Sequence, residues 1–155
     1  MKTPVILAAA LALAASACSS SRPSAASFYA EHLRDINRWD PVRGAEGHYA
    51  YEAMLIDPSE SVPILIAKLA DMSPTAIYDG LHDAVPVADV AFHILLRIFS
   101  MKPEAFDREG VWIMRSDPSN NPIYQVKFRD EESRARVAGR FRFMAVERGW
   151  YPSDE

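Results

Sequence analysis

The residues of this sequence that could act as a general base lie in a polar segment near its middle. His82 is followed by Asp83 and preceded by Asp79, and a histidine beside a carboxylate can activate a nucleophile that lies close to it. No G-x-S-x-G pattern supplies an activated serine. These residues would support a small hydrolase that uses the segment 71–85, but a polar loop explains them more simply.

A second candidate pair is Asp89 and His93, which are four residues apart and could share one face of a helix as metal ligands. Two ligands without a third do not make a metal site, and no HExxH pattern is present. An acidic residue in the first turn of a helix also suits the helix dipole without any metal. We therefore expect no metal and no cofactor.

The C-terminal segment 127–148 is basic, with seven Lys and Arg against four Asp and Glu, a net charge of +3. Arg136, Arg140 and Arg142 could bind the phosphate groups of anionic lipid or lipopolysaccharide, because guanidinium groups pair with phosphate bidentately. A solvated helix face with ion pairs such as Glu132 to Arg136 is the simpler explanation. The whole chain has a formal charge of −4, which argues against nucleic-acid binding.

The only cysteine, Cys18, excludes an intrachain disulfide and thiolate metal sites. It ends an N-terminal segment with the layout of a secretory signal: a positive Lys2, an apolar run over Val5–Ala15, and small residues up to Ala17. The apolar run is shorter than the roughly 20 residues that span a bilayer. We expect residues 1–17 to be a signal peptide.

The run Leu13-Ala14-Ala15-Ser16-Ala17-Cys18 resembles the lipobox of bacterial lipoproteins, with Ala15 in place of the more usual leucine. The resemblance implies that Cys18 is acylated and becomes the mature N-terminus. Ser19 resembles the residue that sorts such proteins to the outer membrane, which implies a lipid-anchored protein of the cell envelope, facing the periplasm. Alternatively, Ala15-Ser16-Ala17 is an ordinary A-x-A cleavage site, and the protein is soluble in the periplasm or secreted.

The mature chain is predicted to consist of a tether followed by one domain. Residues 18–27 are small and polar, which predicts a lipidated tether, and residues 28–155 have a length typical of a single domain. The periodicity of apolar residues predicts four helices before the final third of the chain, and turn-forming residues predict a long loop over 71–85. The expected helices are residues 28–40 capped by Ser27, residues 49–56, a helix that begins at Ser59 or Ser61 with Pro63 in its first turn, and residues 86–100.

Two of these helices carry a family resemblance. The stretch 61–71 resembles the first helix of a HEAT repeat, and 87–95 resembles the second, with Ala91 and Leu95 at its small and large core positions. The loop between them is much longer than the tight turn of that family. The resemblance implies a small HEAT-like helical bundle, and HEAT-like helices mostly serve as binding scaffolds.

The final third of the chain predicts a β-hairpin and a last helix. Strands at 111–115 and 123–128 flank a dense run of turn formers, and together they make a hairpin over 111–128. Tyr124, Val126 and Phe128 would share a face covered by Trp112 and Met114. Asp130 would cap a helix over 131–148 whose inward residues are Val137, Phe141 and Met144. The aromatic pair after Gly149, Trp150 and Tyr151, would fold back onto the core or form a contact patch.

The predicted fold is therefore mainly α: a HEAT-like helical bundle with a C-terminal β-hairpin and a final helix. The predicted function is that of a non-catalytic, lipid-anchored cell-envelope protein, a protein-interaction or scaffold module. Its expected partners are the membrane, through the lipid on Cys18, and another envelope protein. A small periplasmic hydrolase and a binder of anionic lipid are the alternatives.

Overall fold

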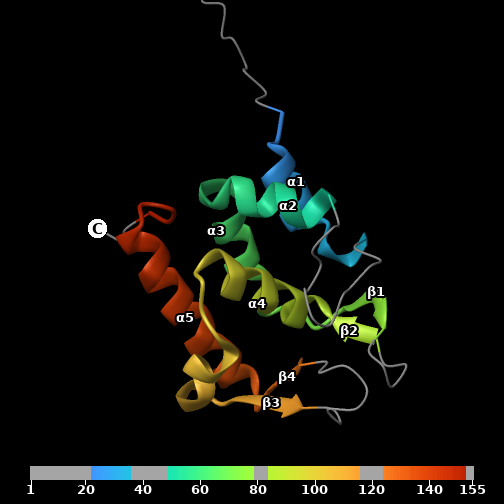
Figure 1. Ribbon diagram of the computed structural model, residues 1–155, viewed down its shortest axis with the longest axis vertical. Coiled ribbons are helices and arrows are strands. Elements are labelled where there is room, and N and C mark those ends of the chain that lie inside the picture. Colours follow the sequence, from blue (N-terminus) through green and yellow to red (C-terminus); the bar gives the residue numbers. More distant parts are fainter. Residues whose placement is uncertain (1–21, 36–48, 79–83, 116–123, 153–155) are drawn as a thin grey trace, which may run out of the picture.

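Helices dominate the structure, as the sequence predicts. A computed structural model describes residues 22–35, 49–78, 84–115 and 124–152 (Figure 1). The predicted fold class is confirmed at this level: the chain is mainly helical, with a β-hairpin and a last helix in its final third. In chain order the elements are α1 (Ala25–Glu31), the 3-10 helix η1 (Leu33–Asp35), α2 (Tyr49–Ile56), α3 (Pro58–Lys68), β1 (Pro74–Tyr78), β2 (Ala84–Pro86), α4 (Val87–Ile98), the 3-10 helix η2 (Pro103–Glu109), β3 (Val111–Arg115), β4 (Tyr124–Phe128) and α5 (Glu131–Glu147).

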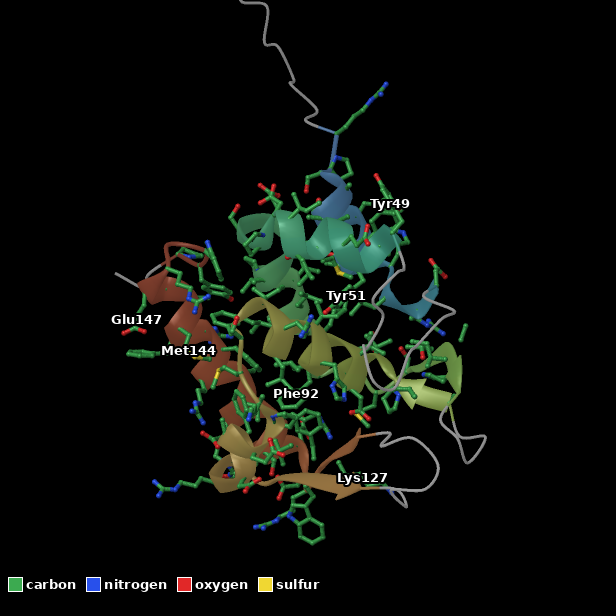
Figure 2. The ribbon with its side chains drawn as sticks, in the orientation of Figure 1. Tyr49, Tyr51, Phe92, Lys127, Met144 and Glu147 are labelled. Carbon is green, nitrogen blue, oxygen red and sulfur yellow. The ribbon has the colours of Figure 1, made fainter. Side chains whose placement is uncertain are left out.

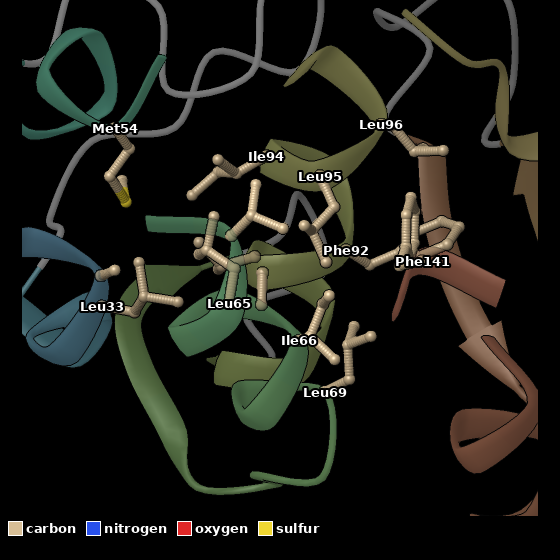
Figure 3. Close-up of a cluster of buried hydrophobic side chains, with 14 of the residues drawn as sticks. Leu33, Met54, Leu65, Ile66, Leu69, Phe92, Ile94, Leu95, Leu96 and Phe141 are labelled. Carbon is tan, nitrogen blue, oxygen red and sulfur yellow. The ribbon is translucent and has the colours of Figure 1, made fainter. Parts of the chain in front are cut away.

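The hydrophobic core is built around α4, where eight of twelve residues are buried. α3 packs against α4, and α1 packs against α2 and α3. Figure 3 shows Leu65 and Ile66 of α3 near Leu95 of α4, with Phe141 of α5 beside Phe92 of α4. Removing each such side chain from water stabilises the fold by about 1.5–3 kcal/mol.

The ring of Phe92 connects α4 to the final third of the chain. It makes edge-to-face contacts with Phe106 of η2 and Phe128 of β4, at centroid distances of 5.3 and 5.5 Å, and a third with Phe141 of α5 at 6.0 Å. Offset or edge-to-face aromatic pairs stabilise a fold beyond the area that they bury. Three elements that follow α4 in the chain therefore converge on one of its side chains.

The predicted bounds of α2 are confirmed, but those of α3 are wrong at the start. α3 begins at Pro58 with Asp57 as its N-cap residue, so neither Ser59 nor Ser61 is the cap, and Pro63 lies inside the helix. Ser61 instead is fully buried, and its hydroxyl donates a hydrogen bond to the carbonyl of Met54 at 2.9 Å. This bond satisfies a polar group in the core and fixes α3 against α2.

α1 begins three residues earlier than predicted. The hydroxyl of Ser24, not that of Ser27, accepts the capping hydrogen bond, from the amide of Ser27 at 3.1 Å. Residues 25–27, assigned to the tether from their composition, are therefore helical, and α1 ends at Glu31 rather than near residue 40. Residues 36–40 of that predicted helix lie outside the described residues.

The long loop predicted over 71–85 is wrong, because β1 and β2 pair as an antiparallel hairpin there. Thr75 and Ile77 are buried while Ala76 is exposed, which is the alternation of a strand with one face on the core. The Thr75 hydroxyl donates to the carbonyl of Val85 at 2.7 Å and ties the two strands together.

The hairpin of β3 and β4 is confirmed, but its predicted face is wrong by one residue. Val111 lies opposite Phe128, and Trp112 lies opposite Lys127. Directly opposed residues of an antiparallel pair share a face, so Val111 joins Phe128 on the core side. Trp112 is 59% exposed on the other side.

A tight contact joins the start of β3 to the first turn of α5. Asp130 caps α5 as predicted, with one carboxylate oxygen accepting from both the amide and the hydroxyl of Ser133 at 2.7 Å. Gly110 packs against this turn in the left-handed region, with φ of 85°, and a Cβ added there would lie 2.6 Å from the Ser133 Oγ. Only glycine fits this position without strain.

We expect Gly110→Ala to lower the free energy of unfolding by about 1–3 kcal/mol, because it combines a left-handed φ with a clash against buried Ser133. Gly139→Ala is the matched control, since nothing lies within 4 Å of its added Cβ inside α5. The control should stabilise the helix by about 0.5–1 kcal/mol. Urea unfolding monitored by circular dichroism measures both, and equal effects of the two variants would contradict the packing described.

Candidate functional site

All three arginines predicted to bind anionic lipid have partners inside the domain, and two of them contact η2. Arg140 pairs with the carboxylate of Glu109 at 2.8 Å, donates to the carbonyl of Ala105, and lies over the ring of Phe106 at 4.6 Å. Arg136 donates to the Glu109 carbonyl at 3.2 Å. These arginines hold η2 against α5.

The remaining contacts of this basic face are also internal. Arg136 pairs with Glu132 at 2.8 Å, which is the four-residue ion pair predicted from sequence. Arg142 lies over the ring of Tyr151 at 5.4 Å. The structure thus supplies intramolecular partners for all three predicted residues, and anionic-lipid binding through them stays a prediction.

The aromatic residues after α5 fold back onto the core. Trp150 packs edge-to-face on Phe99 at 5.6 Å, and its amide donates to the carbonyl of Ala145 at 2.8 Å. The guanidinium of Arg148 lies over both rings, 4.7 Å from the centroid of Phe99 and 5.0 Å from that of Trp150. Of the two alternatives for this pair, folding back onto the core is confirmed, because both Trp150 and Tyr151 pack against the core cluster.

The residues that carried the other chemical hypotheses are mostly outside the described part of the chain. Cys18 lies there, as do Asp79, His82 and Asp83, so lipid attachment and hydrolysis stay predictions. Among the described residues, no three His, Cys, Asp or Glu side chains are grouped so that they could hold a metal ion.

Asp89 has an environment that its sequence neighbours did not indicate. It lies in the first turn of α4, partly buried, where burial raises the pKa of its carboxyl to about 7, while Arg134 and Lys127 act in the opposite direction. Within the described residues, the Nε of Arg134 is buried without a hydrogen-bond partner. A carboxyl of this kind exchanges its proton near neutral pH, and perturbed groups of this kind are enriched at functional sites.

Trp112 is 59% exposed on the outer face of the β3–β4 hairpin, beside two cationic side chains. We call Trp112, Lys127 and Arg129 the hairpin patch. The guanidinium of Arg129 lies 5.8 Å from the centroid of the Trp112 ring, and Lys127 is directly opposite Trp112 and exposed. Figure 2 shows Lys127 at one end of the long axis, far from α1 and α2. Sequence reasoning missed this patch because it assigned Trp112 to the covered face.

No family, no curated protein and no solved structure matches this chain. The resemblance to HEAT repeats therefore stays a prediction, although α3 and α4 do pack against each other. None of the helices in the described ranges is long and apolar enough to span a bilayer.

We expect Asp89→Asn to stabilise the protein above pH 7 by about 1–3 kcal/mol, because the wild type must then bury a charge. The pKa of the Asp89 carboxyl is about 7 in the folded state, and its ordinary value is 3.8. Between these values the folded state holds more protons than the unfolded state, so the free energy of unfolding falls as pH rises. Below pH of about 4 the carboxyl is protonated in both states, and the advantage of the variant should vanish.

Urea unfolding of wild type and variant across this pH range measures the difference. Asp107→Asn, which removes an exposed carboxylate of η2, is the matched control and should show no comparable gain. A variant less stable than wild type at pH 8 would show instead that the attraction of Arg134 and Lys127 outweighs the desolvation of Asp89.

Proposed function

We propose that this chain is a non-catalytic, lipid-anchored protein of the cell envelope whose helical domain binds a protein partner. The anchor is inferred from the lipobox-like run that ends at Cys18. Burial of a lipid chain contributes about 0.8 kcal/mol per methylene, so two or three chains give stable attachment to a membrane. The anchor defines where the domain acts, and the hairpin patch is the surface through which it acts.

The observation that carries partner binding is the 59% exposure of Trp112. Tryptophan and arginine are enriched among the residues that dominate the energy of protein interfaces, and here an arginine lies over the exposed ring. A cation over the ring face restrains the indole, which lowers the entropy lost when a partner covers it. The hairpin patch thus combines a large apolar area with two cationic donors.

The internal contacts of Arg136 and Arg140 favour this function over the binding of anionic lipid by α5. Each guanidinium already has a carboxylate partner within 2.8 Å. Binding phosphate through them would require those pairs to open, and for Arg140 would also remove contacts that hold η2. Lys127 and Arg129 of the hairpin patch favour a partner surface with acidic residues.

The anchor is tested by replacing Cys18, the residue that would carry the lipid. We expect the wild-type chain, expressed in bacteria, to incorporate radiolabelled palmitate and to fractionate with membranes, and Cys18→Ser to lose both, because only a thiol forms the thioether. Ser16→Ala is the matched control, since it leaves the thiol in place. Intact-mass measurement of the mature protein should show an acylated N-terminal Cys18, and an unmodified mature chain would contradict the anchor.

The hairpin patch is tested by chemical cross-linking of a C-terminally tagged chain in envelope extracts. We expect Trp112→Ala to reduce the yield of a discrete cross-linked species about tenfold or more, as truncation of a dominant interface residue does. Phe143→Ser removes a similarly exposed aromatic side chain from α5 and should leave the yield unchanged. Equal yields from wild type and Trp112→Ala would exclude the patch as the binding surface.

A further inference from the structure

A second exposed apolar surface lies at the end of the domain where the described chain begins. The outward side of α2 consists of Tyr49, Glu52 and Ile56, spaced three and four residues apart. Tyr49 is 67% exposed and Ile56 82% exposed, and Phe28 of the adjacent α1 is 45% exposed. We call Phe28, Tyr49 and Ile56 the α1–α2 face.

The aromatic side chains of this face are held in place by one another. The ring of Tyr29 meets Phe28 edge-to-face at 5.4 Å and Tyr49 at 5.6 Å, which links α1 to α2. Phe28 also stacks on His32 at 4.2 Å. Figure 2 shows Tyr49 on the outer side of α2 and Tyr51 on the inner side, toward α4. The exposed rings are therefore fixed by packing and are ready to contact another surface.

The position of this face relative to the anchor limits what can cover it. Ser24 caps α1 at this end of the domain (Figure 1), and only six residue steps separate it from Cys18. A chain extends at most about 3.3–3.6 Å per residue, so the cap lies within roughly 20 Å of the acylated sulfur. Any lipid on Cys18 therefore holds the α1–α2 face close to the bilayer.

We propose that the α1–α2 face rests on the surface of the bilayer that carries the lipid of Cys18. This inference depends on the lipid anchor of the proposed function. Tyrosine is enriched where proteins meet the membrane–water interface, and isoleucine gains free energy when it leaves water for the acyl region. The hairpin patch lies at the other end of the long axis (Figure 1) and points away from the membrane, toward a partner.

The charges of this face favour apolar contact over electrostatic attraction. Glu52 is the one charged residue in α2, and it lies between Tyr49 and Ile56 on the outward side. A carboxylate there gains nothing from anionic headgroups. Contact with the bilayer should therefore depend little on salt, in contrast to a surface held by arginines.

The test supplies the anchor chemically, so that it does not depend on acylation in the cell. The processed chain 18–155, which contains every described residue, is coupled through its single cysteine to one myristoyl-length chain. A single chain of this kind gives only weak, reversible binding, so an added contact is measurable. We expect wild type to partition into phosphatidylcholine vesicles about tenfold more strongly than the double variant Tyr49→Ser, Ile56→Ser, by co-sedimentation.

Two controls make the result specific to the α1–α2 face. Phe143→Ser removes an equally exposed aromatic side chain, 65% exposed, from α5, and it should partition like wild type. Raising NaCl from about 0.1 to 0.5 M should change the partitioning of wild type less than twofold. Circular dichroism establishes that each variant is folded.

Equal partitioning of wild type and the double variant would overturn the proposal, as would an equal loss in Phe143→Ser or a strong dependence on salt. If the wild-type chain incorporates no palmitate in cells, while the chemically acylated chain still partitions more strongly than the double variant, the native anchor is refuted and the affinity of the α1–α2 face for a bilayer is not. The two failures are therefore distinguishable.

Discussion

The packing of Phe92 joins the two parts of the domain. The preceding helices α1 to α3 pack among themselves, α2 and α3 also contact α4, and α3 contacts α5. Phe106, Phe128 and Phe141 contact Phe92 from the final third of the chain. The arginines of α5 act at the rim of this contact, where Arg140 and Arg136 bind η2. Through Phe128 of β4, the burial of this aromatic cluster thus fixes where the hairpin patch lies.

The sequence predicted those parts of the fold that depend on neighbouring residues. The bounds of α2, the capping of α5 by Asp130 and the strands of the second hairpin follow from local periodicity, capping and turn residues. The first hairpin was missed because its strands are short and its flanking prolines and Asp79-Gly80 suggested a loop. The face of the β3–β4 hairpin on which Trp112 lies was predicted wrongly, because that face depends on the register between the two strands and neither strand encodes the register alone.

The surfaces of functional interest were less predictable, because their partners come from distant parts of the chain. The basic character of α5 is evident in the sequence, but the pairing of Arg140 with Glu109 spans 31 residues and has no signature in spacing. The sequence offered only His93 and the helix dipole as neighbours of Asp89, whereas the charges that act on its pKa belong to Arg134 and Lys127. Only the folded chain brings these groups together.

The convergence of four rings has an evolutionary consequence. A smaller or larger side chain at Phe92 changes the space available to Phe106, Phe128 and Phe141 together, and close-packed interiors relax only partly. Drift at these four positions should consequently be concerted: an aliphatic replacement in one would favour a compensating enlargement in another. Such correlated changes among diverging orthologues would identify these four positions as one packed cluster, even where overall sequence identity is low.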